Sequence, residues 1–414
     1  MLIFTSLKSK NYRFFFTGQA FSNLGNMMKQ VAVGWLVYRM TGSALLLGVL
    51  AFSREISAFV FSTIAGVLAD RYNKHKLLMV CQSLITVNAA VLAWLTISGQ
   101  VTVAILILLE IIFGIISGLE MPSRHAFVND LVDDKSYLTN AIALNSSLFN
   151  TARILGPGLA GILIPIIGEG YCFLIYALAS FSVIVFFTFI DYQPSHKPIG
   201  KRNFKKEFAE GARYAMKTKH ILFLILFVAA ITLIGVSYMV ILPVFAVTVF
   251  HGDAIIFGYM TSAVGLGSLL GAVWIGTKNN AVGLDKLILV GTVIFGLGLA
   301  VFSVSTLLWV SLLALVATGL GRVVIFTSSN TLVQTIAPEE KRGRVLSFYI
   351  MLFMGALSLG SFIIGLVTDW IGAPMAVLAG SLGVLILAFF YGKNLPFIRN
   401  RTYRAIKKSE IQNL

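Results

Sequence analysis

The sequence predicts an all-α membrane protein with twelve transmembrane helices in two six-helix halves. Three observations predict it: an apolar composition, twelve apolar runs of membrane-spanning length, and a partial repeat between the halves. Of 414 residues, 57% are apolar and 12% are charged, whereas soluble proteins average roughly 45–50% and about 25%. So few charges cannot cover a water-facing globule of this length. A soluble enzyme, a disordered chain and a disulfide scaffold are therefore excluded.

Apolar runs long enough to cross a bilayer, which takes about 20 residues, follow one another along the chain. Those of the first half lie near 14–38, 44–68, 77–98, 101–121, 139–164 and 171–190. Those of the second half lie near 221–249, 256–277, 286–304, 307–328, 345–368 and 374–392. The first run follows a short basic segment without a small-residue cleavage site, so we expect it to be retained as a span.

A polar stretch separates the two sets of runs. The expected organisation is an N-terminal half, a cytoplasmic linker, a C-terminal half and a basic cytoplasmic tail, at 1–190, 191–220, 221–392 and 393–414. In the linker, Phe204, Phe208 and Ala212 recur at helical spacing between basic residues. This pattern is typical of an amphipathic helix lying on a membrane surface; a solvated linker is the alternative.

The two halves repeat some of their glycines. Gly156 and Gly161 in the fifth run correspond to Gly360 and Gly365 in the eleventh, and a short charged connection precedes each pair. Two six-span halves related by a repeat are typical of alternating-access transporters. A chance recurrence is the alternative, because glycine is abundant in this chain.

The lysines and arginines fall mainly on one side of the predicted spans, in loops, in the linker and in both tails. On the other side the loops hold only Arg39. Because basic residues stay in the cytoplasm during insertion, both termini are predicted to be cytoplasmic. The net charge of +15 is then explained by topology and by contact with anionic lipids, without a nucleic-acid partner.

A loop motif of the form G-x-x-x-D-R-x-x-K-x-K joins the second and third runs, from Gly66 to Lys76. Gly66 permits close helix packing, and Asp70, one turn later, suits the positive N-terminal end of another helix. Arg71 is expected to pair with Glu120 at the cytoplasmic end of the fourth run. With Lys74, these residues form a predicted cytoplasmic gate. The alternative is that the basic residues only stop translocation.

This motif is the most specific signature of the major facilitator superfamily, which the chain resembles over essentially its whole length. Residues 11–15 (NYRFF), 122–124 (PSR), 152–157 (ARILGP) and 338–344 (PEEKRGR) resemble the bacterial enterobactin-exporter-like branch. The last of these segments adds Arg344 to the predicted gate.

The resemblance implies the major facilitator fold, with spans 1, 4, 7 and 10 lining a central cavity. It also implies a bacterial inner-membrane location and proton-driven export of siderophores or drug-like molecules. Position 26 is Asn where members of the branch often carry Asp.

Six ionisable residues lie well inside the predicted spans: Lys29, Arg54, Glu55, Glu110, Arg153 and Arg322. At the centre of an isolated helix each costs at least about 2.5 kcal/mol, so each is expected to pair, line water or face the bundle interior. Asn26 and Gln30 fall on one stripe of the first helix beside Lys29, and Asn150 shares a face with Arg153. These residues form the predicted substrate and proton pathway, with Arg322 nearer the cytoplasm.

Two acids are the candidates for proton coupling. Glu110 is the first and Glu55 the second, because no other acid lies deep in a predicted span. Glu110 is expected to pair with Arg153, and Glu55 with Lys29 or Arg54. Cations outnumber acids in this layer, which favours binding of an anion or water. The alternative is an ion network with a purely structural role.

The function predicted from these features is secondary active export of a small amphipathic or anionic molecule, siderophore-like or drug-like, in exchange for protons. The pair Gly156-Pro157 resembles the fifth-span motif of superfamily exporters and favours this direction. The alternatives are an importer with the same fold and a non-transporting scaffold or sensor. The sequence predicts a monomer whose partners are a small-molecule substrate, protons and anionic lipids.

Signatures of enzymatic or ATP-driven function are missing from the sequence. It contains no phosphate-binding G-x-x-x-x-G-K-[ST] motif, which excludes ATP-driven pumping by this chain. Its five histidines are scattered without metal-ligand spacing. We therefore expect no enzymatic activity, no cofactor and no metal.

The charge distribution predicts which positions an impermeant thiol reagent reaches in intact cells. A cysteine introduced by Arg39→Cys should be modified from outside, and one introduced by Lys205→Cys should be modified only after the membrane is opened. Labelling of position 205 in intact cells would contradict the orientation.

Overall fold

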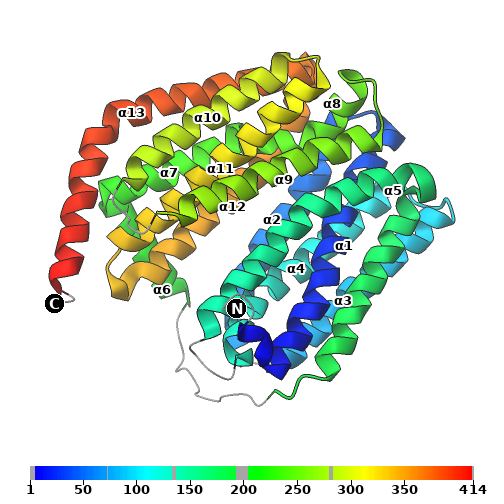
Figure 1. The fold of residues 1–414 in the computed structure, drawn as a ribbon, viewed down its shortest axis with the longest axis horizontal. Coiled ribbons are helices and arrows are strands. Elements are labelled where there is room, and N and C mark those ends of the chain that lie inside the picture. Colours follow the sequence, from blue (N-terminus) through cyan, green and yellow to red (C-terminus); the bar gives the residue numbers. More distant parts are fainter. Residues whose placement is uncertain (1–4, 72, 133–136, 193–203, 279–282, 413–414) are drawn as a thin grey trace. The chain divides into compact units, whose positions relative to one another are not determined.

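The computed structural model describes residues 5–71, 73–132, 137–192, 204–278 and 283–412 of the chain (Figure 1). All long elements among the described residues are α-helices, and no strand occurs among these residues. They group into two compact units. Unit 1 comprises residues 1–200 and 246–262, and unit 2 comprises residues 201–245 and 263–414.

The described residues of unit 1 up to 192 form five long helices. After a 3-10 turn, η1 (Thr5–Lys8), these are α1 (Lys10–Thr41), α2 (Ala44–Arg71), α3 (Lys74–Ile97), α4 (Val103–Leu131) and α5 (Leu138–Thr188). Helix α1 packs along α5, α2 packs along α4, and α3 contacts both α4 and α5. Side chains cap two of the helix starts, since Asn73 Oδ1 accepts from the Lys76 amide and Thr102 Oγ1 from the Ile105 amide.

Helix α5 merges two of the expected spans. It runs for 51 residues, with non-helical backbone at Gly168 (φ 83°, ψ 164°). This positive φ favours glycine and divides the helix into two arms. The apolar runs predicted two spans, over 139–164 and 171–190; the structure joins them through a single bent residue instead of a loop.

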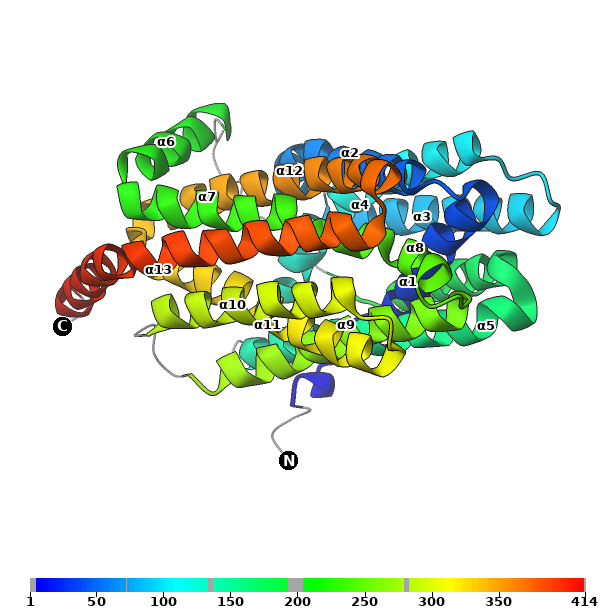
Figure 2. The same ribbon diagram turned by 90° about the horizontal axis from the view of Figure 1, so that it is seen from above.

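Unit 2 begins with the linker helix α6 (Phe204–Lys217), which packs on α12 and α7. The other elements are α7 (Lys219–Ile234), η3 (Val236–Ile241), α8 (Leu242–Thr248), α9 (Ala254–Gly276), α10 (Leu284–Val304), α11 (Leu308–Ile336), α12 (Glu339–Ile371) and α13 (Ala373–Gln412). Helix α10 lies beside α11 and α13, and α12 beside α7 (Figure 2). The boundary between the units falls within α8 and α9.

A helix thus lies where the linker pattern predicted one. Residues 193–203, which make up much of the expected linker, lie outside the described residues. The expected division into halves at 190 and 221 stays a prediction.

Within the described part of the chain, ten helical segments are long and apolar enough to cross a membrane. Helix α1 is not among them, because Gln19, Asn23, Asn26, Lys29 and Gln30 lower its apolar character. The ten segments establish a helical membrane protein. The expected count of twelve stays a prediction.

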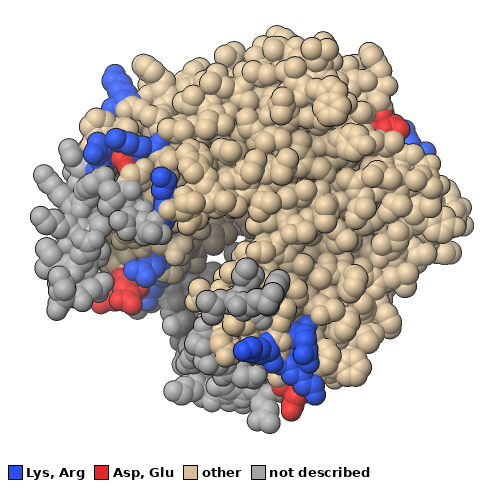
Figure 3. Space-filling view, in the orientation of Figure 1, with Lys and Arg blue, Asp and Glu red and all other residues tan. Residues whose placement is uncertain are grey.

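The surface fits a lipid environment. Large apolar side chains point outward from the helices, including Trp309 and Trp370, each 78% exposed. On the face drawn in Figure 3, charged residues leave most of the described surface to uncharged ones. Such exposure would be unfavourable in water and is ordinary in contact with lipid.

Glycines set the distance between α2 and α4. A Cβ atom on Gly118 would lie 2.5 Å from the Ala58 carbonyl oxygen and 3.0 Å from Ala58 Cα. A Cβ atom on Gly114 would overlap the Arg54 carbonyl oxygen. The backbones of α2 and α4 therefore touch at two successive turns, as small residues allow in membrane helix pairs.

Gly118→Ala should destabilise the protein, because its methyl group would press on the α2 backbone; overpacking of this kind costs about 1–3 kcal/mol. The matched control is Gly355→Ala on α12, where a Cβ atom would meet no heavy atom within 4 Å. The apparent melting temperature in detergent should fall for Gly118→Ala and hold or rise for the control. Equal melting temperatures would contradict the close approach.

Candidate functional site

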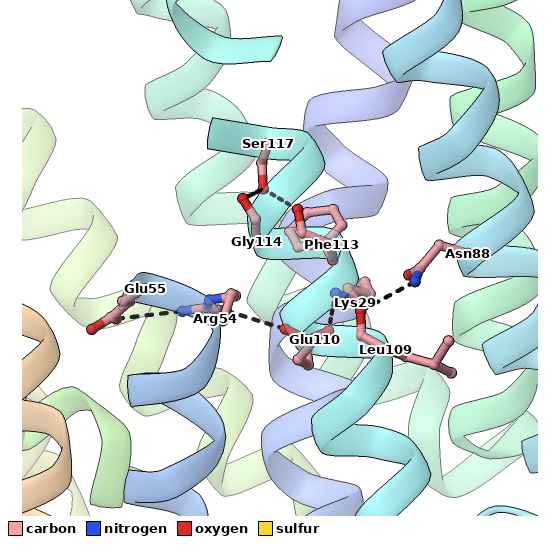
Figure 4. A network of polar contacts seen from close by, with 9 residues as sticks. All are labelled: Lys29, Arg54, Glu55, Asn88, Leu109, Glu110, Phe113, Gly114 and Ser117. Carbon is pink, nitrogen blue, oxygen red and sulfur yellow. Dashed lines mark hydrogen bonds and ion pairs between the residues drawn. The ribbon is translucent and has the colours of Figure 1, made fainter. Parts of the chain in front are cut away.

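Three helices of unit 1 bring ionisable side chains together within the apolar bundle. Lys29 comes from α1, Arg54 and Glu55 from α2, and Glu110 from α4 (Figure 4). The glycine contact described above explains part of this convergence. Gly114 lies one turn after Glu110 and faces the Arg54 backbone, so the absence of a Cβ atom there lets α2 approach at the depth of the charges.

Glu110 lies between two cations. Its Oε1 forms an ion pair with Lys29 Nζ, and its Oε2 lies 3.9 Å from Arg54 Nη1. The Lys29 and Glu110 side chains are 1% and 3% exposed, whereas that of Arg54 is 27% exposed. Arg54 Nη2 lies 3.6 Å from Glu55 Oε1. Two cations and two acids form this ion network, so its formal charge is balanced.

An aromatic ring completes the surroundings of Lys29. The ammonium lies 3.7 Å from the centroid of Phe113, over its face, a cation–π arrangement that is strengthened when the cation is desolvated. Sequence reasoning missed Phe113. Its spacing was a usable signal, since it follows Glu110 by three residues and so shares a helix face with it.

A hydrogen bond holds α3 against α4 at the same depth. Asn88 Nδ2 on α3 donates to the Leu109 carbonyl oxygen at 3.1 Å (Figure 4). The side chain of Asn88 is buried, so this bond satisfies a polar group that would be costly in the apolar interior. It anchors the backbone next to Glu110.

The expected pair between Glu110 and Arg153 is wrong. Helix α4 packs mainly against α2 and α3 and has little contact with α5, so Lys29 and Arg54 occupy the Glu110 carboxylate instead. The guanidinium of Arg153 lies over Phe149, 4.8 Å from the ring centroid. Of the two partners proposed for Glu55, the structure pairs it with Arg54.

The polar residues predicted to lie beside the network are on the helices expected for them. Asn26 and Gln30 lie on α1, on either side of Lys29, and Asn150 lies on α5 one turn before Arg153. The Asn26 Oδ1 atom is buried and has no hydrogen-bond partner among the described residues. Asn26 is thus an open acceptor in the helix that carries Lys29.

Arg322 belongs to unit 2. Its Nη1 lies 2.9 Å from Met239 Sδ and its Nη2 lies 3.3 Å from Ser268 Oγ. The tenth apolar run ends near 328, which predicted a position for Arg322 nearer the cytoplasm. Helix α11 continues to Ile336, which puts Arg322 at its midpoint.

The gate residues are only partly described. Gly66, Asp70 and Arg71 lie in the last turns of α2, but their side chains lie outside the described residues. Glu120 Oε1, the expected partner of Arg71, lies 3.6 Å from Arg124 Nε. The pairing of Arg71 therefore stays a prediction.

The remaining gate residues pair within their own units. Lys74 Nζ lies 2.7 Å from Asp130 Oδ2 in unit 1, and Arg344 Nη1 lies 2.5 Å from Glu210 Oε2 on α6 in unit 2. Sequence reasoning missed both acids. Both acids lie on the predicted cytoplasmic side of the spans, as do the lysine and the arginine that they pair with. This shared side was the signal in the sequence that could have suggested the pairs.

A cluster around Asp130 joins the end of α4 to its neighbours. Tyr192, which follows α5, donates its hydroxyl to Asp130 Oδ2 at 2.9 Å, and Lys74 at the start of α3 binds the same oxygen. Burial and the Asp130 carboxylate raise the pKa of Tyr192 above its ordinary value, so the phenol remains a donor at neutral pH. This cluster ties three chain segments together without a role in the ion network.

At the C-terminal end of α1, Arg39 forms an ion pair with Glu169. Arg39 Nε and Nη2 donate to the two Glu169 oxygens at 2.8 and 3.1 Å. Glu169 follows the bend at Gly168, so the pair fixes the bend of α5 to the end of α1. Among the described residues, no group of three or more His, Cys, Asp or Glu side chains is placed to hold a metal ion.

Comparison with known proteins gives the chain a family and a fold. Residues 3–409 match the family described as transmembrane secretion effector. The staphyloferrin A transporter of Staphylococcus aureus is 26% identical over 365 residues, covering 87% of this chain and 90% of that protein. The multidrug efflux pump Tap of Mycolicibacterium fortuitum is 25% identical over 375 residues, covering 88% and 90%.

Solved structures of transporters share the fold at low sequence identity. A POT family transporter in complex with 5-aminolevulinic acid has a TM-score of 0.76 at 12% identity, covering 94% of this chain and 96% of that one. A bacterial homologue of the human lysosomal transporter Spinster has a TM-score of 0.71 at 14% identity, covering 95% and 97%. These similarities support the major facilitator fold.

The ion pair between Lys29 and Glu110 predicts a non-additive response to mutation. Lys29→Met and Glu110→Gln should each destabilise the protein, because each leaves part of a buried charge pair uncompensated; breaking such a pair costs about 3–5 kcal/mol. The double variant should be more stable than the sum of the single losses predicts. Additive changes in the unfolding midpoint, measured in detergent, would show that the pair is not formed.

Proposed function

The chain belongs to the transmembrane secretion effector family of major facilitator transporters, and from this premise we propose that it exports a siderophore-like or drug-like molecule in exchange for protons. That it is a membrane transporter and not an enzyme follows from its family and relatives. The direction, the cargo and the coupling ion are the proposed part.

The observation that carries the proposal is the position of Glu110 between Lys29 and Arg54 in unit 1. An ionised carboxylate is needed to hold both cations, and a proton binds the same oxygens. Protonation of Glu110 therefore competes directly with its ion pairs. A group that exchanges a proton for a salt bridge inside the membrane can link proton entry to helix movement.

The network offers a route for this exchange within the unit. When Glu110 takes up a proton, Arg54 keeps Glu55 as an acidic partner, whereas Lys29 keeps the face of Phe113 and has no other acidic partner among the described residues. An anionic or strongly polar cargo group near Lys29 would compensate its charge. Cargo binding and protonation of Glu110 would then favour each other, and the return of Glu110 to Lys29 would favour release of both.

Export is the favoured direction because the family description is a secretion effector and one relative is named as an efflux pump. Import by the same fold is the second candidate, since the name of the staphyloferrin A transporter states no direction. Everted membrane vesicles with an acidic interior separate the two. An exporter that exchanges cargo for protons accumulates cargo in such vesicles, and a proton-coupled importer does not.

Twelve spans remain our proposal for the topology. At a rise of 1.5 Å per residue, α5 would extend roughly 76 Å if it were straight, far more than the roughly 30 Å of a hydrocarbon core. Its arms on either side of Gly168 would each cross once. With α1 as a further span, these arms bring the count to twelve and leave both termini in the cytoplasm of the bacterial cell.

The cytoplasmic gate remains a proposal as well. Asp70, Arg71 and Glu120 would close the inner end of unit 1, while Lys74 and Arg344 are engaged by Asp130 and Glu210. Anionic lipids would contact the basic linker helix and tail. We propose that a single chain is sufficient for transport.

Glu110→Gln tests the coupling role, because it preserves size and removes the titratable group. It should abolish accumulation driven by a pH gradient, measured in everted vesicles with a panel of siderophores and fluorescent drugs, while cargo binding persists with a flattened pH dependence. The matched control is Glu169→Gln, which removes an acid paired with Arg39 outside the ion network. Normal pH-driven transport by Glu110→Gln would exclude Glu110 as the sole proton carrier.

A further inference from the structure

Arg322 is a cation in the middle of a membrane-spanning helix with only neutral partners. Among the described residues it contacts the Met239 thioether and the Ser268 hydroxyl, and no acid lies within ion-pair distance of it. The acids of unit 2 whose side chains are described lie on the linker helix or near helix ends: Glu210, Asp285, Glu339, Glu340 and Asp369. A guanidinium at this depth is costly without a counter-charge.

The helix that faces Arg322 is interrupted at the point of contact. Residues 219–248 have the length and composition of one span, but α7 ends at Ile234 and the 3-10 segment η3 replaces it before α8 begins. Met239 lies in η3. Backbone that departs from an α-helix within a membrane is tolerated where it is buried in protein or lines a water-filled site, and discontinuous spans often hold the cargo in transporters.

A second polar group in η3 lacks a partner. Tyr238 is 1% exposed, and its hydroxyl has no hydrogen-bond partner among the described residues. It belongs to the same 3-10 segment as Met239, which contacts Arg322. Edge-to-face contacts with Phe295 and Phe302 of α10 hold its ring, at centroid distances of 6.5 and 6.3 Å. A buried donor fixed in this way is costly unless something accepts from it.

Gly235 allows the aromatic ring of Phe295 to pack at the interruption after α7. A Cβ atom there would lie 2.6 Å from Phe295 Cε1 and 2.8 Å from Val384 Cγ2. Without it, the Phe295 ring packs directly against the end of α7. The break, the aromatic rings and the cation therefore belong to one local arrangement in unit 2.

We propose that Arg322, Tyr238 and Ser268 form a binding site for a carboxylate carried by an aromatic or otherwise amphipathic molecule. The guanidinium binds the two carboxylate oxygens, the tyrosine hydroxyl donates a third hydrogen bond, and Phe302 and Phe295 flank the apolar part. For its role in transport the inference rests on the proposed function, since the carboxylate would belong to the cargo.

Charge matching selects a carboxylate over a phosphate. The site offers one positive charge, and a carboxylate neutralises it with one negative charge. A phosphate group carries up to two charges at neutral pH, so one would remain uncompensated at membrane depth. The planar fork of arginine also matches the geometry of a carboxylate through two parallel hydrogen bonds.

Matched acids and amides test the site without transport. The probes are benzoate, 3-phenylpropionate and 4-phenylbutyrate, each paired with its uncharged amide, added to the purified full chain in detergent. At least one acid should raise the melting temperature more than its amide, because a ligand that binds only the folded protein stabilises it. Inorganic phosphate and chloride at the same concentration should stabilise less.

Variants assign the binding to these residues. Arg322→Gln should abolish the difference between acid and amide. Tyr238→Phe, which removes only the hydroxyl, should weaken acid binding roughly ten-fold, as loss of a hydrogen bond to a charged group does. Glu169→Gln, in the other unit and outside the ion network, should bind the acid as the parent protein does. If Arg322→Gln does not fold, the acid–amide difference in the parent protein and in Tyr238→Phe decides.

Several outcomes would overturn the proposal. They are an acid series that stabilises no better than its amides, an acid effect that persists in Arg322→Gln, an unchanged affinity in Tyr238→Phe, and stronger stabilisation by phosphate. If the acids stabilise no better than their amides, Arg322 has only the structural role of linking α11 to η3 and α9. Because no gradient is applied, acid binding without transport would contradict the proposed function alone, and transport without the acid–amide difference would contradict this site alone.

Discussion

The pairing of Lys29 with Glu110 is the constraint on which unit 1 depends. A lysine with 1% of its side chain exposed cannot remain charged in an apolar bundle unless a carboxylate lies against it. Satisfying Lys29 requires α1 and α4 to face each other at one depth, and Arg54 on the other carboxylate oxygen brings in α2. The least apolar of the long helices in unit 1, α1, is thus held through its buried lysine.

Close packing makes that pairing possible. Gly114 and Gly118 let α4 approach the α2 backbone, and Asn88 ties α3 to the turn that carries Glu110. In α5, a Cβ atom on Gly156 would lie 2.5 Å from Met27 Cβ, so the helix that carries Arg153 also touches α1 closely. Glycine has a packing role in each case. The charged side chains of neighbouring helices can contact one another because the helix backbones lie so close together.

The two units accommodate buried cations in different ways. Unit 1 matches Lys29 and Arg54 with Glu110 and Glu55, whereas unit 2 surrounds Arg322 with a thioether and a hydroxyl. A balanced network responds to protons, because each acid can exchange its partner. A cation among neutral dipoles responds to anions. This difference suits a transporter in which unit 1 responds to protons and unit 2 offers a further site for an anion.

The sequence alone determined the class of protein, the positions of the apolar helices and the ionisable residues inside them. Local physics explains this success, since helix periodicity, hydropathy and the cost of a buried charge can all be evaluated from neighbouring residues. The major facilitator resemblance, carried by the motif from Gly66 to Lys76, also led to the family that the comparisons show.

Only the tertiary structure decided which charges meet. Glu110 could have reached Arg153 on sequence grounds, but α4 packs on α2, so the partners are Lys29 and Arg54. Phe113 is identified as part of the site only by the structure, which places the Lys29 ammonium over its ring. The break after Ile234 and the neutral surroundings of Arg322 also lay beyond the sequence, because an apolar run looks the same whether its helix is continuous or interrupted. Partner choice depends on the packing of segments far apart in the chain, and no local pattern encodes it.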